Sequence, residues 1–252
     1  MNQALKFVLL IAVVGAWPGP TFAQSADEIV EKYLAALGGR NSLSKIQSRI
    51  TTGTIAVSTP GGEFSGSVAR YDKAPNKSRV LTKLDLSAVG AGEMTRDQRF
   101  DGASGIILDS LSGDSEIAGR QLDSLRSGYF PNVYLNYKDR GATVELLGKE
   151  KVGSRDAYVL QYTLKPGAPA KHYIDAESFL LIRSVTKIST AQAGEIEQTA
   201  DFSDYRAVDD VKVPFQTKTS SPVQSLSITV SKVEQNAAVD DAMFSKPGAD
   251  KK

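Results

Sequence analysis

The sequence predicts a mainly β protein of the α+β class, in which a curved antiparallel sheet is accompanied by an N-terminal helix and a helical insert. Three observations support this fold class. An apolar stripe at helical spacing follows residue 25, about a dozen short β-rich runs follow residue 50, and the strand pattern stops only over residues 114–137. So many consecutive strands cannot stay flat, so the sheet must curl into a barrel or split into a sandwich to bury its apolar faces.

The first helix has clear signals at both ends. Ser25 and Glu28 have the spacing of a capping box, and Gly38-Gly39 supplies a stop after the last apolar position. A second, shorter helix is expected to begin at a cap on Asn41 or Ser42. The apolar stripe of the first helix consists of Ile29, Val30, Tyr33, Leu34 and Leu37.

Strand-forming runs then recur at short intervals, separated by turn residues. Leu226, Ile228 and Val230 alternate with serine and threonine, so these three side chains are expected on the dry face of the sheet. Leu160 and Tyr162 alternate with polar residues in the same way. The runs cover residues 50–58, 63–71, 78–86, 98–100, 106–109, 143–147, 157–164, 171–175, 179–188, 195–205, 211–217 and 224–233.

The insert at residues 114–137 is the odd element of a sheet protein. Ile117, Leu122 and Leu125 lie near helical spacing, and the sequence Tyr129-Phe130-Pro131 ends any helix and is expected to expose large aromatic side chains in a loop. The insert can either plug the core or form a lid over a cavity. Likewise, the dry face can either pack solid or leave an apolar groove, because periodicity does not separate these outcomes.

Residues 1–23 read as a secretory signal peptide. An apolar run of about 11 residues follows Lys6, and small residues precede a cleavage point after Ala23. This run is shorter than the roughly 20 residues that a membrane-spanning helix needs. The chain contains no cysteine, which excludes disulfides and the acylated N-terminal cysteine of a bacterial lipoprotein.

The remaining chain is balanced in charge. Residues 24–252 carry 29 basic and 29 acidic side chains without long blocks of one sign, which argues against nucleic acid as a partner. We expect a single domain over residues 24–247, followed by a flexible tail at residues 248–252.

Catalytic patterns are scarce, and the sequence predicts no enzyme, no metal and no cofactor. The single histidine, His172, lies in a strand without a cysteine to share a metal and is interpreted as structural. Gly102-Ala103-Ser104-Gly105 lacks the spacing of a hydrolase elbow and is interpreted as a hairpin turn. Glu195 and Glu197 form a pair of carboxylates such as a glycosidase site contains, but we interpret them as part of a solvated strand face. The same interpretation applies to Asp209-Asp210 and Asp240-Asp241.

Four segments resemble the periplasmic outer-membrane lipoprotein-sorting proteins of the LolA-like superfamily. The resemblance lies in residues 147–160 (LGKEKVGSRDAYVL), 172–183 (HYIDAESFLLIR), 201–214 (DFSDYRAVDDVKVP) and 239–247 (VDDAMFSKP). The N-terminal helix and Phe100-Asp101-Gly102 agree with it. The resemblance covers most of residues 24–252, and its motifs are structural turns and strand ends.

This resemblance implies an incomplete, strongly curved antiparallel β-barrel with helices across its mouth, around an apolar cavity that holds acyl chains in characterised relatives. The chain is longer than the founding carrier, and the membrane-anchored receptor branch is disfavoured because the acylated cysteine is absent. The resemblance therefore predicts a soluble periplasmic carrier for a lipid or the acyl chain of a lipoprotein, with inner- and outer-membrane transport proteins as possible partners.

Seven residues are predicted to line the cavity, with residues 114–137 as its gate: Leu160, Tyr162, Leu226, Ile228, Val230, Tyr129 and Phe130. The alternative is a non-catalytic interaction domain with a filled barrel. Such a domain would bind a protein partner through an exposed strand edge or through the loop at Tyr129 and Phe130.

Overall fold

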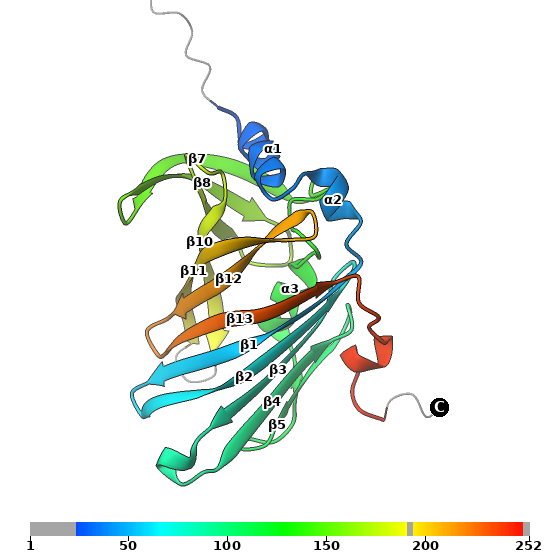
Figure 1. Ribbon diagram of the computed structural model, residues 1–252, viewed down its shortest axis with the longest axis vertical. Helices are drawn as coiled ribbons and strands as arrows, with labels where there is room; N and C mark the ends of the chain where they lie inside the picture. Colours follow the sequence, from blue (N-terminus) through cyan, green and yellow to red (C-terminus); the bar gives the residue numbers. More distant parts are fainter. Residues whose placement is uncertain (1–23, 191–193, 249–252) are drawn as a thin grey trace, which may run out of the picture.

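The computed structural model describes residues 24–190 and 194–248 and contains one antiparallel sheet of 13 strands. The strand order is β6-β5-β4-β3-β2-β1-β13-β12-β11-β10-β9-β8-β7, and the sheet does not close, since β6 and β7 stand at its two ends. Figure 1 shows the sheet curving from β7 to β5, with α1 and α2 beside the β7–β8 end and α3 inside the curve. The predicted mainly β fold, an incomplete barrel with an N-terminal helix and a helical insert, is therefore confirmed.

The strands are linked almost entirely by short turns, as the sequence predicts. Their bounds are β1 (Ser48–Thr59), β2 (Gly62–Lys73), β3 (Lys77–Asp85), β4 (Glu93–Phe100), β5 (Gly105–Asp109), β6 (Ser115–Ile117), β7 (Thr143–Val152), β8 (Arg155–Thr163), β9 (Ala170–Asp175), β10 (Leu181–Thr190), β11 (Gly194–Val208), β12 (Val211–Ser220) and β13 (Ser225–Gln235), with a 3-10 turn η1 (Ser87–Val89) after β3.

The N-terminal helix α1 (Ala26–Ala36) begins with the predicted capping box. The Ser25 hydroxyl accepts from the Glu28 amide at 3.2 Å, and the Glu28 carboxylate accepts from the Ser25 amide at 3.0 Å. The cap predicted for α2 (Arg40–Ser44) is wrong: the N-cap residue is Gly39, with φ +89°, and it makes no side-chain cap. The second helix starts earlier because Gly38 and Gly39 turn the chain sharply enough to begin it at once.

The tight turn after α1 gives a testable difference between two neighbouring glycines. Gly38 has φ +123°, and a Cβ there would lie 2.0 Å from the Asp210 carbonyl oxygen, whereas a Cβ on Gly39 meets nothing within 4 Å. We expect Gly38→Ala to lower the free energy of unfolding by about 2–3 kcal/mol and Gly39→Ala by about 1 kcal/mol. Urea denaturation of both variants measures this. Equal effects would show that the contact with Asp210 does not constrain the turn.

The insert at residues 114–137 differs from its prediction in both secondary structure and packing. Ile117 lies in the short strand β6, which pairs with β5, and the helix α3 (Gly119–Ser127) begins only after it. The aromatic residues that follow are not exposed: Phe130 is buried and Tyr129 is half-buried. The expected exposed aromatic loop is therefore wrong, because the chain after α3 turns inward beneath α1.

Two of the three core clusters lie at the two ends of the curved sheet, and the third consists of Ala157, Val159, Tyr173 and Ile182 on β8–β10. The larger cluster lies where α1, α2 and the inward-turning loop cover β7–β9, and a smaller cluster consists of Ile55, Val68, Leu84 and Leu86 on β1–β3 and the turn after β3. The larger cluster contains Ile29, Val30, Tyr33, Leu34, Leu37, Leu43, Ile46, Phe130, Tyr134, Leu135, Tyr137, Ala142, Tyr158, Leu160, Tyr162, Ile174 and Val211. One end of the half-barrel is thus packed solid.

The segment after β13 folds back along the sheet next to β3 and β4. The short 3-10 helix η2 (Asp241–Phe244) is capped by Asp240, whose carboxylate accepts from the Ala242 amide at 3.0 Å, and Phe244 is buried. Asp241 forms ion pairs with Lys73 at 2.8 Å and Lys77 at 3.0 Å. The Asp240-Asp241 pair therefore has a structural role. The predicted signal peptide at residues 1–23 lies outside the described residues, as do residues 249–252 of the predicted tail.

Candidate ligand-binding cavity

The concave face of the sheet encloses a cavity of about 1290 Å³ at the end that α1 does not cover. It lies between β1–β4, β13 and α3, with the β8–β9 loop and the β10–β11 hairpin at its border. Its volume exceeds the roughly 300–1,000 Å³ of pockets that hold drug-sized molecules. This half of the barrel is open, so the sheet is solid at one end and hollow at the other.

The aliphatic and aromatic side chains that line the cavity from β1–β4, β13 and the turns form what we call the apolar wall. It exists because inward positions alternate along each strand and stand opposite one another across the sheet: Ile55 pairs with Ile228, and Val57 pairs with both Leu226 and Phe64. The apolar wall consists of Ile55, Val57, Phe64, Leu84, Leu86, Met94, Val223 and Leu226.

The charged and polar side chains that line the cavity form what we call the polar wall, and most of them come from α3 and the β10–β11 hairpin. Arg120 of α3 forms a short ion pair with Glu195 of β11, and Lys187 of β10 lies 3.4 Å from the same carboxylate. Asp123 lies one turn after Arg120 on α3. Polar amides and a hydroxyl accompany these charges. The polar wall consists of Arg96, Gln98, Asp109, Arg120, Gln121, Asp123, Ser124, Lys187, Glu195 and Gln198.

Arg96 and Asp109 form one corner of the polar wall, in which the carboxylate is buried and the guanidinium is partly exposed. Their ion pair spans 2.8 Å, and Asp109 also accepts from the amides of Leu111 and Ser112, each at 3.0 Å. The hydrogen bond from the Ser112 amide, with those from Leu111 and Arg96, lowers the pKa of Asp109 below 3.8 against the opposing effect of burial. The carboxylate is therefore ionised and fully engaged at neutral pH.

The helix α3 covers the cavity without being part of the core. None of its residues is buried, and its C-terminal end is fixed, since Arg126 donates twice to the Ala103 carbonyl at 2.7 and 3.1 Å. On the other side, Gly167 of the β8–β9 loop fits closely against Ser127, where a Cβ would approach the Ser127 hydroxyl to 2.7 Å. The N-terminal end of α3 is held by the exposed ion pair between Arg120 and Glu195. This half of the insert fits a cover over the cavity, while residues 129–137 plug the packed end.

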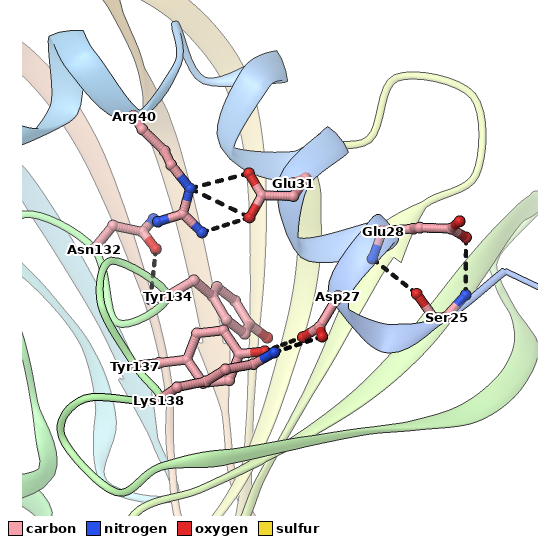
Figure 2. Close-up of polar contacts among 9 residues, drawn as sticks. All are labelled: Ser25, Asp27, Glu28, Glu31, Arg40, Asn132, Tyr134, Tyr137 and Lys138. Atoms are coloured by element: carbon pink, nitrogen blue, oxygen red, sulfur yellow. Dashed lines mark hydrogen bonds and ion pairs between the residues drawn. The ribbon is translucent and has the colours of Figure 1, made fainter.

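Polar contacts attach α1 to the loop that plugs the packed end (Figure 2). Asp27 accepts a short hydrogen bond from the Tyr137 hydroxyl and one of 2.5 Å from Lys138 Nζ. These two hydrogen bonds, Lys138 first, lower the pKa of Asp27 below 3.8. Arg40 binds Glu31 through both Nε and a terminal nitrogen, the shortest distance being 2.5 Å. The first turn of α1 is thus bound to the plugging loop and its middle to α2, over a filled core.

The structure distributes the predicted cavity residues over three places. Leu226 lines the cavity, and Ile228 packs beside it against the smaller core cluster. Val230 is partly buried one position further along the same face. Leu160 and Tyr162 are buried in the solid core under α1.

Tyr129 and Phe130 border a separate cavity of about 470 Å³ between α2 and the loop after α3. The other residues that border this cavity are Arg40, Asn41, Ser44, Ile46, Gln47, Ala74, Pro75, Pro131, Leu135 and Asn136.

Most of the apolar wall was not anticipated from the sequence. Ile55 and Val57 alternate with Thr54 and Ala56 in the same manner as Leu226 and its neighbours, so the period-2 signal was present in the first strand. Nothing local marks the polar wall, because Arg120 and Glu195 are 75 residues apart.

His172 lies in the packed core among aromatic rings. Its Nδ1 is 2.6 Å from the Tyr134 hydroxyl, and its ring stacks on Tyr162 at 6.1 Å between centroids. Burial lowers the pKa of His172 to about 4 and raises that of Tyr134, so a protonated hydroxyl can donate to a neutral imidazole at pH 7. A structural role, as predicted, agrees with these contacts.

The desolvated imidazole of His172 predicts a pH dependence of stability. The pKa of His172 is about 4 in the folded protein and 6.5 in the unfolded chain. Between these pH values the unfolded chain binds a proton that the folded chain does not. Stability should therefore fall by about 3 kcal/mol as the pH drops from 6.5 to 4. Urea denaturation of the wild type and His172→Gln across this range isolates the effect, because carboxylates titrate in both. Parallel curves for the two proteins would contradict a neutral, desolvated His172.

The remaining motifs have structural roles. Gly102 and Ala103 lie in the turn between β4 and β5, where the Asp101 carboxylate accepts from the amides of Ala103 and Ser104, so the predicted hairpin turn is confirmed. Glu195 borders the cavity, but it is paired with two cations, and Glu197 does not line the cavity. The described residues contain no cluster of three or more potential metal-ligating side chains. Nor does any described helix have the length and apolar character needed to cross a membrane.

Comparisons with known proteins place the fold. No family model matches the chain, and no curated protein matches it at the level of sequence. Among solved structures, a LolA superfamily protein from Nitrosomonas europaea has a TM-score of 0.56 at 15% identity, over 89% of this chain and 99% of its own. A DUF1329 family protein from Desulfovibrio piger has a TM-score of 0.54 at 14% identity, over 88% and 98% of the two chains.

A third structure, a putative outer membrane lipoprotein-sorting protein domain from Vibrio parahaemolyticus, has a TM-score of 0.51 at 14% identity, over 86% of this chain and 94% of its own. These likenesses are too distant in sequence to transfer an activity, but they agree on the arrangement of strands and helices over most of the chain. The protein therefore has the LolA-like fold that the sequence resemblance predicts.

Proposed function

We propose that the protein is a non-catalytic periplasmic carrier that binds a lipid, or the acyl group of a lipoprotein, in the cavity beside α3. The observation that supports this most strongly is the apolar wall, where eight side chains from β1–β4, the turns and β13 face one hollow. Each methylene group moved from water into such surroundings contributes about 0.8 kcal/mol, so an acyl chain can be held without any covalent chemistry.

The form of the cavity supports a carrier better than a filled interaction domain. A filled barrel would bury the inward side chains of every strand, whereas here Val57, Phe64 and Leu226 remain only partly buried and border about 1290 Å³ of free volume. The fold that this chain shares with a putative outer membrane lipoprotein-sorting protein domain is consistent with the proposal. The predicted signal peptide at residues 1–23 would deliver such a carrier to the periplasm.

The proposal is tested by purifying the protein without detergent and recording native mass spectra before and after incubation with single-chain lipids of 8 to 16 carbons. We expect one bound lipid per chain, with affinity rising with chain length by about fourfold for each methylene until the cavity is filled. A protein that takes up no lipid of any length, and that carries none from the cell, would contradict the proposed function.

A further inference from the structure

The charges that border the cavity cancel. Among the described residues, three cationic and three anionic side chains line it, and each of the cations has an anion close by. Arg96 pairs with Asp109, while Arg120 and Lys187 share Glu195. The third anion, Asp123, lies three residues after Arg120 on α3 and makes the numbers of lining cations and anions equal.

Most of the charged groups come from α3 and the β10–β11 hairpin, and most of the apolar groups come from β1–β3, β13 and the turns. Two residues depart from this division, since Arg96 follows Met94 on β4 and Ile188 lies beside Lys187 on β10. A hydrocarbon alone would displace water from the polar wall without replacing its hydrogen bonds, and an ion alone would gain nothing from the apolar wall. The cavity is therefore complementary to a molecule with one apolar and one polar part.

Resting on the proposed function, we propose that the cavity selects an amphiphile whose polar headgroup carries no net charge, such as a zwitterionic phosphate-ammonium group. Its acyl part lies against the apolar wall, and its headgroup lies beside α3. An anionic headgroup would gain from Arg120 and Lys187 but lose to Asp123 and Glu195, and a cationic headgroup would meet the reverse. A zwitterion can place each of its charges beside an opposite charge of the wall.

The headgroup has room at the polar wall because its charges are partly hydrated. The side chains of Arg120 and Lys187 are 68% and 65% exposed, and that of Glu195 is 43% exposed. Exposed pairs of this kind are individually weak, so a bound headgroup can exchange partners with them at small cost. The wall therefore acts on selectivity more than on affinity.

The test compares three amphiphiles with matched acyl chains: lysophosphatidylcholine, lysophosphatidylglycerol and an alkyl trimethylammonium, which are zwitterionic, anionic and cationic. At low ionic strength and below their critical micelle concentrations, we expect the zwitterion to bind the wild type more tightly than either charged ligand. Glu195→Gln removes one negative charge and should tighten binding of the anionic ligand about threefold to fivefold, with little change for the zwitterion. Arg120→Gln should tighten binding of the cationic ligand by a similar factor.

Glu197→Gln is the matched control, because Glu197 is an exposed carboxylate on the same face of β11 but does not line the cavity. It should leave all three affinities unchanged. The inference is overturned if the wild type binds the three ligands with equal affinity, or if Glu195→Gln and Glu197→Gln change these affinities by the same factor. If none of the three ligands binds, the proposed function itself fails, so the two failures are distinguishable.

Discussion

Replacing Val57 with glutamate is expected to weaken binding of a long-chain fatty acid or single-chain lipid by about 100-fold or more. Val57 is half-buried on the inward face of β1 and belongs to the apolar wall. A bound acyl chain would strip water from the new carboxylate, and the loss of its hydration costs several kcal/mol, of which about 2.8 kcal/mol corresponds to 100-fold. Titration with a fluorescent fatty acid measures the change.

Thr54→Glu is the matched control for this prediction. Thr54 lies on the same strand but is exposed on the outward face, so its glutamate remains hydrated whether or not a ligand is bound. We expect its affinity to stay within about twofold of the wild type, with both variants folded by circular dichroism. Equal binding by Val57→Glu and the wild type would show that the ligand does not occupy the cavity beside α3.

Replacing Tyr134 with alanine is expected to lower the free energy of unfolding by about 3–5 kcal/mol. Tyr134 is the largest fully buried side chain, and its ring packs edge-on against Tyr33 at 5.5 Å and Tyr162 at 5.8 Å between centroids. Its removal leaves a void that these rigid rings cannot fill. Urea denaturation gives the loss directly.

Tyr134→Phe separates the packing of the ring from its hydroxyl. It removes only the 2.6 Å contact with His172 and is expected to cost about 1 kcal/mol. If Tyr134→Ala were no more destabilising than Tyr134→Phe, residues 129–137 would not be the plug of the packed end.

The elements that the sequence predicted correctly are those governed by local signals. Ser25 and Glu28 determine the start of α1 within one turn, and the alternation around Leu226 correctly identifies the inward face of β13. The strand β6 was missed because three residues are too few for a period to appear. The cap of α2 was misplaced because a glycine with positive φ starts the helix without a side-chain signal.

The sequence could not separate a packed wall from a cavity wall. Leu160 and Leu226 stand in equally regular alternations, yet Leu160 is buried under α1 and Leu226 borders free volume. The difference depends on the path of residues 129–137, which cover one end of the sheet and leave the other end to α3. That path depends on contacts between distant segments, such as the hydrogen bond of 3.0 Å from Asn132 to Tyr33, and no short window of sequence contains them.

The central claim, that an amphiphile binds beside α3, is tested most directly by photo-crosslinking with a diazirine-labelled fatty acid followed by peptide mapping. We predict labels on the peptides that carry the apolar wall, above all around Val57, Leu84 and Leu226, and competition by unlabelled fatty acid. Labels confined to the packed end around Leu160, or labelling that unlabelled fatty acid does not reduce, would contradict it.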